Sequence, residues 1–261
     1  MKNSIFQNLI WQVKRSAKNQ LILQSEPQIF YALKNKNILW LYLFLFASIA
    51  HLSFLLEGLN PYLFFSKPLI LISLIGYFFQ ISKPISWTLL SKATMAALIF
   101  SLIGDVLLLW PHLFIFGLGA FLMAHICYII AFKIAQRNPG KIGKVNFVKV
   151  FLINLPIYIV AALIYFLINS NLGNLKIPVI AYIITIVSMV TLARDRYGKC
   201  SKESFWQVFI GACLFLISDG VLAIDRFYME LPEAGVIIMG TYATAQLLIV
   251  MGIRSHLIKP Q

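Results

Sequence analysis

The chain has 261 residues, of which 60% are hydrophobic and only 12% are charged, and its formal net charge is +13. This composition is too apolar for a soluble domain and is typical of a multi-pass membrane protein. It also argues against nucleic-acid binding, because the basic residues fall between long apolar segments and form no soluble basic domain.

The first 35 residues differ from the rest of the chain. Their apolar side chains recur at helical spacing, at Ile5, Phe6, Leu9, Ile10 and Val13, and Lys14, Arg15 and Lys18 follow. This pattern is typical of a helix lying on a membrane surface. The segment contains no continuous apolar core that would indicate a cleaved signal peptide. We therefore predict a basic amphipathic extension over residues 1–35, with a basic tail that only fixes orientation as the alternative.

Eight apolar segments follow, each about as long as the 20 residues that a helix needs to cross the hydrocarbon core. The sequence therefore predicts an all-α membrane protein with an eight-helix transmembrane bundle over residues 36–257. The expected spans are 37–57, 61–81, 88–109, 112–132, 147–169, 177–193, 205–224 and 234–254.

Basic residues alternate between the connections of these spans. When the N-terminus is assigned to the cytoplasm, all but three of the 22 lysines and arginines are cytoplasmic, and the exceptions are Lys67, Lys176 and Arg226. Because basic residues accumulate on the cytoplasmic side of membranes, both termini are predicted to be cytoplasmic. We expect an integral protein of a bacterial inner (cytoplasmic) membrane.

The two halves of the chain also share a pattern, which predicts two four-helix repeats. Four spans preserve orientation, so the repeats would be parallel, and chance similarity between apolar sequences is the alternative. The corresponding segments are Lys67-Pro68 and Lys176-Ile177-Pro178, Gly104-Asp105 and Ser218-Asp219, and Gly119 with His125 and Gly240 with Gln246.

Asp105 and Asp219 are the candidate catalytic residues. Each interrupts a span that is otherwise fit for lipid, where an ionisable group is costly and marks a functional site. Each lies about five residues, or roughly 7 Å, before the outer end of its span, so we expect the two carboxyl groups at one depth. Lys67 and His51 are expected in the same layer, although for His51 a structural hydrogen bond to a neighbouring carbonyl is the favoured interpretation. A carboxylate beside Lys67 would stay ionised while an unpaired one would hold a proton, which is an acid and base division.

Polar side chains of other spans complete the candidate substrate-binding set. His125 and Tyr128 share one face of the fourth span, and Tyr242 and Gln246 share one face of the eighth. His125 and Gln246 are expected to form a floor below the aspartates, and Tyr182 of the sixth span joins this set. For Tyr242 and Gln246, hydrogen bonds that only join helices are an equal alternative.

Other kinds of site find little support. A zinc site from His51, His125, Asp105 and Asp219 is disfavoured, because zinc prefers two or three nitrogen or sulfur ligands and no paired histidine motif occurs. We therefore predict neither metal nor cofactor. The sequence has no Gly-x-Ser-x-Gly elbow or Walker loop, and its three cysteines show no Cys-x-x-Cys spacing.

Taken together, these motifs resemble the YhhN-like family of integral membrane proteins, whose animal members are transmembrane lysoplasmalogenases. The resemblance covers about residues 40–255. It rests on Ser66-Lys67-Pro68, on Gly104-Asp105-Val106-Leu107-Leu108, on Phe116-Gly117 through Phe121, His125 and Tyr128, on Gly211-Ala212-Cys213-Leu214-Phe215 leading into Ser218-Asp219, and on Tyr242 with Gln246.

The resemblance implies eight spans and a lysophospholipid substrate taken from the bilayer. The implied reaction is hydrolysis of the vinyl-ether bond of a lysoplasmalogen to a fatty aldehyde and glycerophosphoethanolamine or glycerophosphocholine. Two carboxyl groups suit it, one protonating the double bond and one stabilising positive charge. We expect Asp219 to be the acid and Asp105 the charged partner. Lys67 could instead bind the lipid phosphate, while His125 and Tyr128 orient water or the head group.

Two other functions compete with this one. A proton-coupled transporter of small molecules or lipids could use the same embedded aspartates. An intramembrane aspartyl protease is a weaker alternative, because Leu102 replaces the first glycine of the Gly-x-Gly-Asp motif and no tyrosine directly precedes Asp219.

Overall fold

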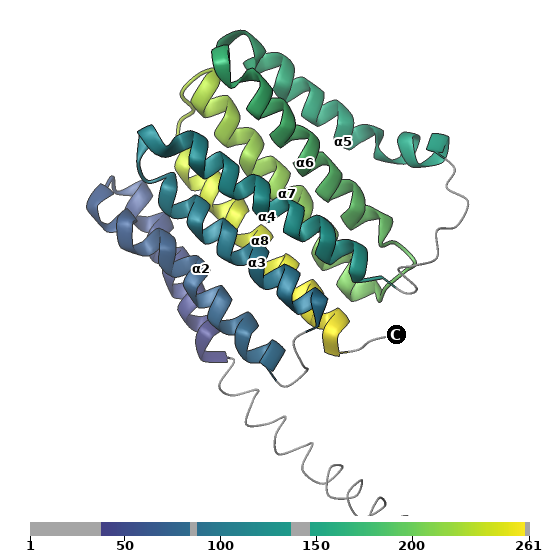
Figure 1. Cartoon of the computed structure of the whole chain (residues 1–261). Coiled ribbons are helices and arrows are strands. Elements are labelled where there is room, and N and C mark those ends of the chain that lie inside the picture. Colours follow the sequence, from purple (N-terminus) through teal and green to yellow (C-terminus); the bar gives the residue numbers. More distant parts are fainter. Residues whose placement is uncertain (1–37, 84–87, 137–146, 259–261) are drawn as a thin grey trace, which may run out of the picture.

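The computed structural model describes residues 38–83, 88–136 and 147–258, so the extension predicted over residues 1–35 lies outside the described residues. Within these ranges the protein has eight helices long and apolar enough to cross a membrane, and it has no strand. The prediction of an all-α, eight-span bundle is therefore confirmed. The helices are Ile38–Leu56, α2 (Asn60–Ser82), α3 (Leu89–Leu107), α4 (Phe114–Ile134), α5 (Phe147–Ile168), α6 (Lys176–Asp195), α7 (Lys202–Phe227) and α8 (Ala234–Ile258) (Figure 1).

Some helices extend beyond the predicted spans. The expected segment 205–224 is the apolar part of α7, which begins at Lys202 and ends at Phe227. Ser201 caps its start, because the Ser201 hydroxyl accepts a hydrogen bond from the backbone N–H of Ser204 at 3.2 Å. Hydropathy thus locates the part of a helix that crosses the membrane, while the helical backbone continues into the polar flanks.

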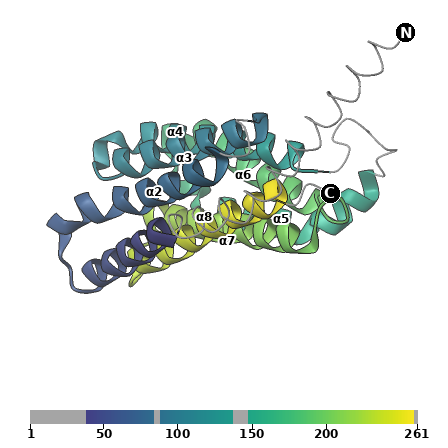
Figure 2. The same ribbon diagram turned by 90° about the horizontal axis from the view of Figure 1, so that it is seen from below.

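The helices form two layers. One layer contains α2, α3, α4 and α6, and the other contains the helix Ile38–Leu56, α8, α7 and α5 (Figure 2). The helix Ile38–Leu56 begins and α8 ends at the same end of the bundle, as an even number of crossings requires (Figure 1). Side chains that point between the layers therefore meet in the interior of the bundle.

Glycines allow α7 and α8 to approach closely. A Cβ atom on Gly252 would lie 3.0 Å from the Ser204 carbonyl oxygen and 3.0 Å from the Val208 backbone nitrogen. Because backbone atoms cannot move aside as a side-chain end can, this contact requires glycine. Gly240 on the same helix has nothing within 4 Å of the corresponding position.

We expect Gly252→Val to lower the free energy of unfolding by about 1–3 kcal/mol, the usual cost of overpacking a close contact. Gly240→Ala is the matched control, and it should leave stability unchanged or raise it. Thermal unfolding of both purified variants in detergent measures the difference. Equal melting temperatures for Gly252→Val and the unmodified protein would contradict the close packing of α7 on α8.

A buried arginine joins three helices at the same end of the bundle as Gly252. Arg196, in the connection between α6 and α7, is fully buried. Its Nε donates to the Ala135 carbonyl oxygen at 3.0 Å and its guanidinium donates to the Ser204 hydroxyl at 2.7 Å. The Ser204 hydroxyl in turn donates to the Gly252 carbonyl oxygen at 2.7 Å. Burial lowers the pKa of Arg196 to about 10, so the guanidinium remains charged at neutral pH.

Candidate active site

Asp105 is held by residues from two other helices. Its carboxyl group is 2% exposed on α3, and its Oδ1 lies 3.8 Å from the Lys67 Nζ of α2. The Tyr242 hydroxyl of α8 donates a hydrogen bond to Asp105 Oδ2 at 2.8 Å. Asp105 therefore faces one cation and one neutral donor, which together compensate an ionised carboxylate inside the bundle.

Asp219 has a different set of neighbours. The Tyr182 hydroxyl of α6 donates to Asp219 Oδ2 at 2.5 Å, and His125 Nε2 of α4 lies 3.7 Å from the same oxygen. No lysine or arginine within the described part of the chain pairs with this carboxyl group. In the predicted repeat, α2 corresponds to α6 and α4 corresponds to α8. Asp105 contacts α2 and α8, and Asp219 contacts α6 and α4, so the two aspartates contact corresponding helices.

Aromatic rings pack among the neighbours of the two aspartates. The Phe215 ring lies 4.8 Å from the His125 ring and 5.4 Å from the Tyr242 ring, measured between centroids. The Phe121 ring packs against the backbone of Gly104, where a Cβ atom would come within 2.6 Å of it. Asp105 and Asp219 therefore belong to one interior cluster, in which Phe215 contacts a neighbour of each.

A polar floor joins α3, α4 and α8. The Tyr128 hydroxyl donates to Gln246 Oε1 at 2.5 Å, and Gln246 Nε2 donates to the Ser101 hydroxyl at 3.0 Å. All three side chains are fully buried. The sequence interpretation missed Ser101, although its position four residues before Asp105 places it on the same helix face.

His125 is fully buried, and neither of its ring nitrogens has a hydrogen-bond partner among the described residues. Its ring stands edge-on to the Tyr182 ring, with 5.2 Å between the centroids. A buried polar atom without a partner is costly, and such atoms in native proteins often serve a ligand or an ordered water. His125 thus marks a polar position beside Asp219.

His51 has the structural hydrogen bond that the sequence favoured, but to a hydroxyl rather than to a carbonyl. His51 Nδ1 lies 2.7 Å from the Ser66 Oγ, and the Ser66 hydroxyl also lies 3.0 Å from the Tyr62 carbonyl oxygen. Across the described ranges, no group of three or more His, Cys, Asp or Glu residues could hold a metal ion.

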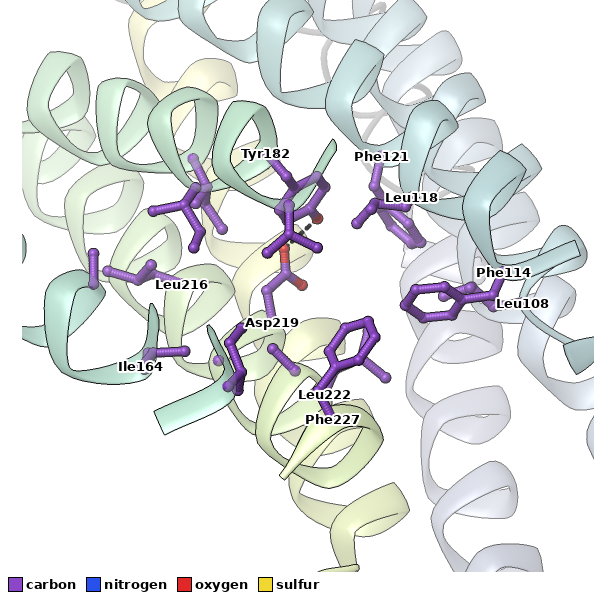
Figure 3. Close-up of a pocket in the computed structure, with 17 residues that line it drawn as sticks. Leu108, Phe114, Leu118, Phe121, Ile164, Tyr182, Leu216, Asp219, Leu222 and Phe227 are labelled. Atoms are coloured by element: carbon purple, nitrogen blue, oxygen red, sulfur yellow. Dashed lines mark hydrogen bonds between the residues drawn. The ribbon is translucent and has the colours of Figure 1, made fainter. Parts of the chain in front are cut away.

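A pocket lies between the two layers, and Asp219 is one of the residues that line it (Figure 3). It contains about 670 Å³ of empty space, its open mouth included. Asp219 and Tyr182 are the lining residues with polar side-chain atoms, and the hydrogen bond between them is drawn in Figure 3. Asp105 is not among the residues that line this pocket. The other lining residues are Leu108, Phe114, Leu118, Phe121, Ala161, Ile164, Ile168, Val179, Ile183, Ile186, Leu216, Gly220, Leu222, Ala223 and Phe227.

Comparison with known proteins places this site in a family. Human Lysoplasmalogenase TMEM86B (Homo sapiens) is 32% identical over 185 residues, which cover 71% of this chain and 72% of that protein. The mouse protein of the same name (Mus musculus) is 34% identical over 168 residues, 61% of this chain and 65% of that protein. Lysoplasmalogenase of Mycobacterium tuberculosis (strain CDC 1551 / Oshkosh) is 34% identical over 160 residues, 60% of this chain and 58% of that protein.

No solved structure matches the chain significantly. The YhhN family model matches residues 62–253, a range that contains both aspartates and every helix that lines the pocket. The chain therefore belongs to the YhhN family.

Proposed function

We propose that this chain is a lysoplasmalogenase-type hydrolase. It cleaves the vinyl-ether bond of lysoplasmalogens and releases a fatty aldehyde and glycerophosphoethanolamine or glycerophosphocholine. The names of its relatives support the reaction class. The observation that carries the proposal is a single carboxyl group, Asp219, in the wall of a pocket whose other lining residues are apolar apart from Tyr182. Such a pocket suits an alkenyl chain whose reactive double bond meets an acid.

The chemistry begins with proton transfer to carbon. The acid protonates the β-carbon of the vinyl ether, the electrons of the double bond form the new C–H bond, and an oxocarbenium ion results. Water then adds to the carbon that bears the oxygen and loses a proton to the carboxylate. The hemiacetal collapses to the aldehyde and the free glycerol hydroxyl. The reaction consumes one water and regenerates the acid.

Asp219 is the proton donor in this scheme. Its contacts within the described residues are a tyrosine hydroxyl and a buried histidine, neither of which compensates a carboxylate as a lysine would. Tyr182 occupies Oδ2, and no hydrogen bond from the described residues reaches Oδ1. A proton on Oδ1 is therefore free to be transferred to the substrate.

Asp105 is the ionised partner. Lys67 and Tyr242 both favour its charged form. Since Asp105 does not line the pocket, the carboxylate acts through its charge, which stabilises the oxocarbenium ion across a medium of low dielectric constant. Lys67 holds this charge in place. Tyr242 and the floor of Tyr128 and Gln246 keep the group oriented.

The attacking water is placed by His125. The 3.7 Å between His125 Nε2 and Asp219 Oδ2 is too long for a direct hydrogen bond, so Nε2 is left to accept a hydrogen bond from a water beside the carboxyl group. Such a water would lie beside Asp219, and it would return its proton to Asp219 after the first transfer. Tyr182 fixes the carboxyl group for both steps.

A substrate comparison tests the proposal. The purified protein in detergent should release fatty aldehyde from 1-alkenyl-lysophosphatidylethanolamine and should leave the ester-linked 1-acyl analogue intact. The difference arises because only the vinyl ether forms an oxocarbenium ion on protonation. A coupled aldehyde assay measures release. Lipid or solute flux in proteoliposomes without aldehyde formation would instead support the transporter alternative.

A further inference from the structure

Beyond Asp219, the pocket extends to one end of the bundle. Phe114 is the first residue of α4, Ile168 the last of α5 and Phe227 the last of α7, and all three line it. Figure 1 shows that α6 begins and α7 ends at this end of the bundle. In the predicted topology it is the non-cytoplasmic end.

Arg226 stands where the pocket reaches this end. It follows Asp219 by seven residues on α7, which places it on the same helix face, about 10 Å further along the axis. Its side chain is exposed. The guanidinium carbon lies over the Phe114 ring, 5.1 Å from the centroid, and the Phe114 ring contacts the Phe227 ring at 5.7 Å. The pocket wall thus holds a cation at its rim.

Within the described residues, the charge of Arg226 is not neutralised by an acidic side chain. No ion pair there involves its guanidinium. The neighbouring Asp225 instead accepts a hydrogen bond from the Leu231 backbone N–H at 2.9 Å. Lys176, in the first turn of α6, lies at the same end of the bundle, three residues before the lining residue Val179. In the predicted topology these are the only lysine and arginine on this side of the membrane.

The spacing fits the proposed substrate. In a lysoplasmalogen, about five single bonds join the vinyl-ether oxygen to phosphorus, a distance of roughly 6 Å at ordinary bond lengths. A substrate whose double bond lies at Asp219 therefore places its phosphate within reach of a side chain about 10 Å along α7. This pose keeps the head group at the membrane surface, as in the bilayer.

We propose that Arg226 binds the phosphate of the substrate head group, with Lys176 as the second cation of this head-group subsite. The inference rests on the proposed function and specifies its substrate as a phosphate-bearing lysolipid that enters head group outward. A guanidinium is suited to this role because its planar donors match phosphate oxygens in pairs. Lys67 is less suited, since it contacts Asp105 and does not line the pocket.

Two substrates distinguish this role from a structural one. With 1-alkenyl-lysophosphatidylethanolamine, Arg226→Gln should raise KM by about ten-fold or more, the order of one lost charge-assisted hydrogen bond, with kcat changed less than about two-fold. With a 1-alkenylglycerol, which has no phosphate, the same variant should keep kcat/KM within about two-fold. Arg226→Lys should lose less than Arg226→Gln, because it keeps the charge without the paired donors. Lys92→Gln, which removes an exposed charge at the opposite end of the bundle, is the control.

Equal losses on both substrates would overturn the proposal, because they would show that Arg226 only supports the pocket wall. An unchanged KM for the phospholipid would also overturn it. If the unmodified protein cleaves neither substrate, the proposed function fails while the subsite remains testable. In that case a non-cleavable 1-alkyl-lysophosphatidylcholine should bind Arg226→Gln about ten-fold more weakly than the unmodified protein. Equal Kd values would then reject the subsite.

Discussion

Replacing Asp219 with Asn should lower kcat for aldehyde release by roughly 10²- to 10⁴-fold, the usual contribution of a general acid. The amide keeps the shape of the carboxyl group, and its oxygen still accepts the hydrogen bond from Tyr182. It has no proton acidic enough to transfer to carbon. Turnover of 1-alkenyl-lysophosphatidylethanolamine in detergent measures the loss, and the melting temperature confirms that the variant is folded.

Asp225→Asn is the matched control, since it makes the same change six residues further along α7. Asp225 accepts a hydrogen bond from the Leu231 backbone and does not line the pocket, and an asparagine oxygen can accept the same bond. We expect turnover close to that of the unmodified protein. Should folded Asp219→Asn keep more than about a tenth of the activity, Asp219 is not the proton donor.

The pair formed by Lys67 and Asp105 should dominate stability. Lys67→Met leaves a carboxylate that is 2% exposed without its cation, and removal of one partner from a buried pair costs about 3–5 kcal/mol. Asp105→Asn should cost less, because the Lys67 side chain is 15% exposed and can turn toward water. The double variant Lys67→Met with Asp105→Asn should recover most of the stability lost in Lys67→Met. Thermal unfolding of the three variants measures this coupling.

Activity should follow a different pattern in the same variants. All three remove the ionised partner or the cation that holds it, so each should turn over substrate slowly even where stability returns. Strictly additive losses of stability would show that the two side chains do not interact. An active double variant would show that catalysis does not need the charge of Asp105.

Much of the bundle was predictable from the sequence. The free-energy cost of placing a charged side chain in lipid predicted both the number of spans and the key residues, because charged side chains are excluded from lipid unless they serve a function. That cost identified Asp105, Asp219 and Lys67, and the structure brings Lys67 to Asp105. Tyr182 and Tyr242 were candidates by their position in the spans, and each donates to one aspartate.

The rest depends on packing between helices distant in the chain. Which aspartate lines the pocket depends on how α3 and α7 pack against their neighbours, and an apolar span carries no signal of that packing. Arg196 was interpreted only as a cytoplasmic charge, yet it is buried and joins α4 to α7. Hydropathy locates a residue along the membrane normal and leaves its neighbours across the bundle undetermined.

Photolabelling tests the central claim most directly, namely that the reactive bond of the lipid lies beside Asp219. A lysophospholipid with a diazirine in place of the vinyl ether would be irradiated with the purified protein, and the adducts mapped by mass spectrometry. We expect labels on α7 around Asp219 and on α6 around Tyr182, and displacement of both by excess alkenyl lysolipid. Labels confined to α2 around Lys67, or spread over the lipid-facing surface and not displaced, would contradict the assignment of this pocket.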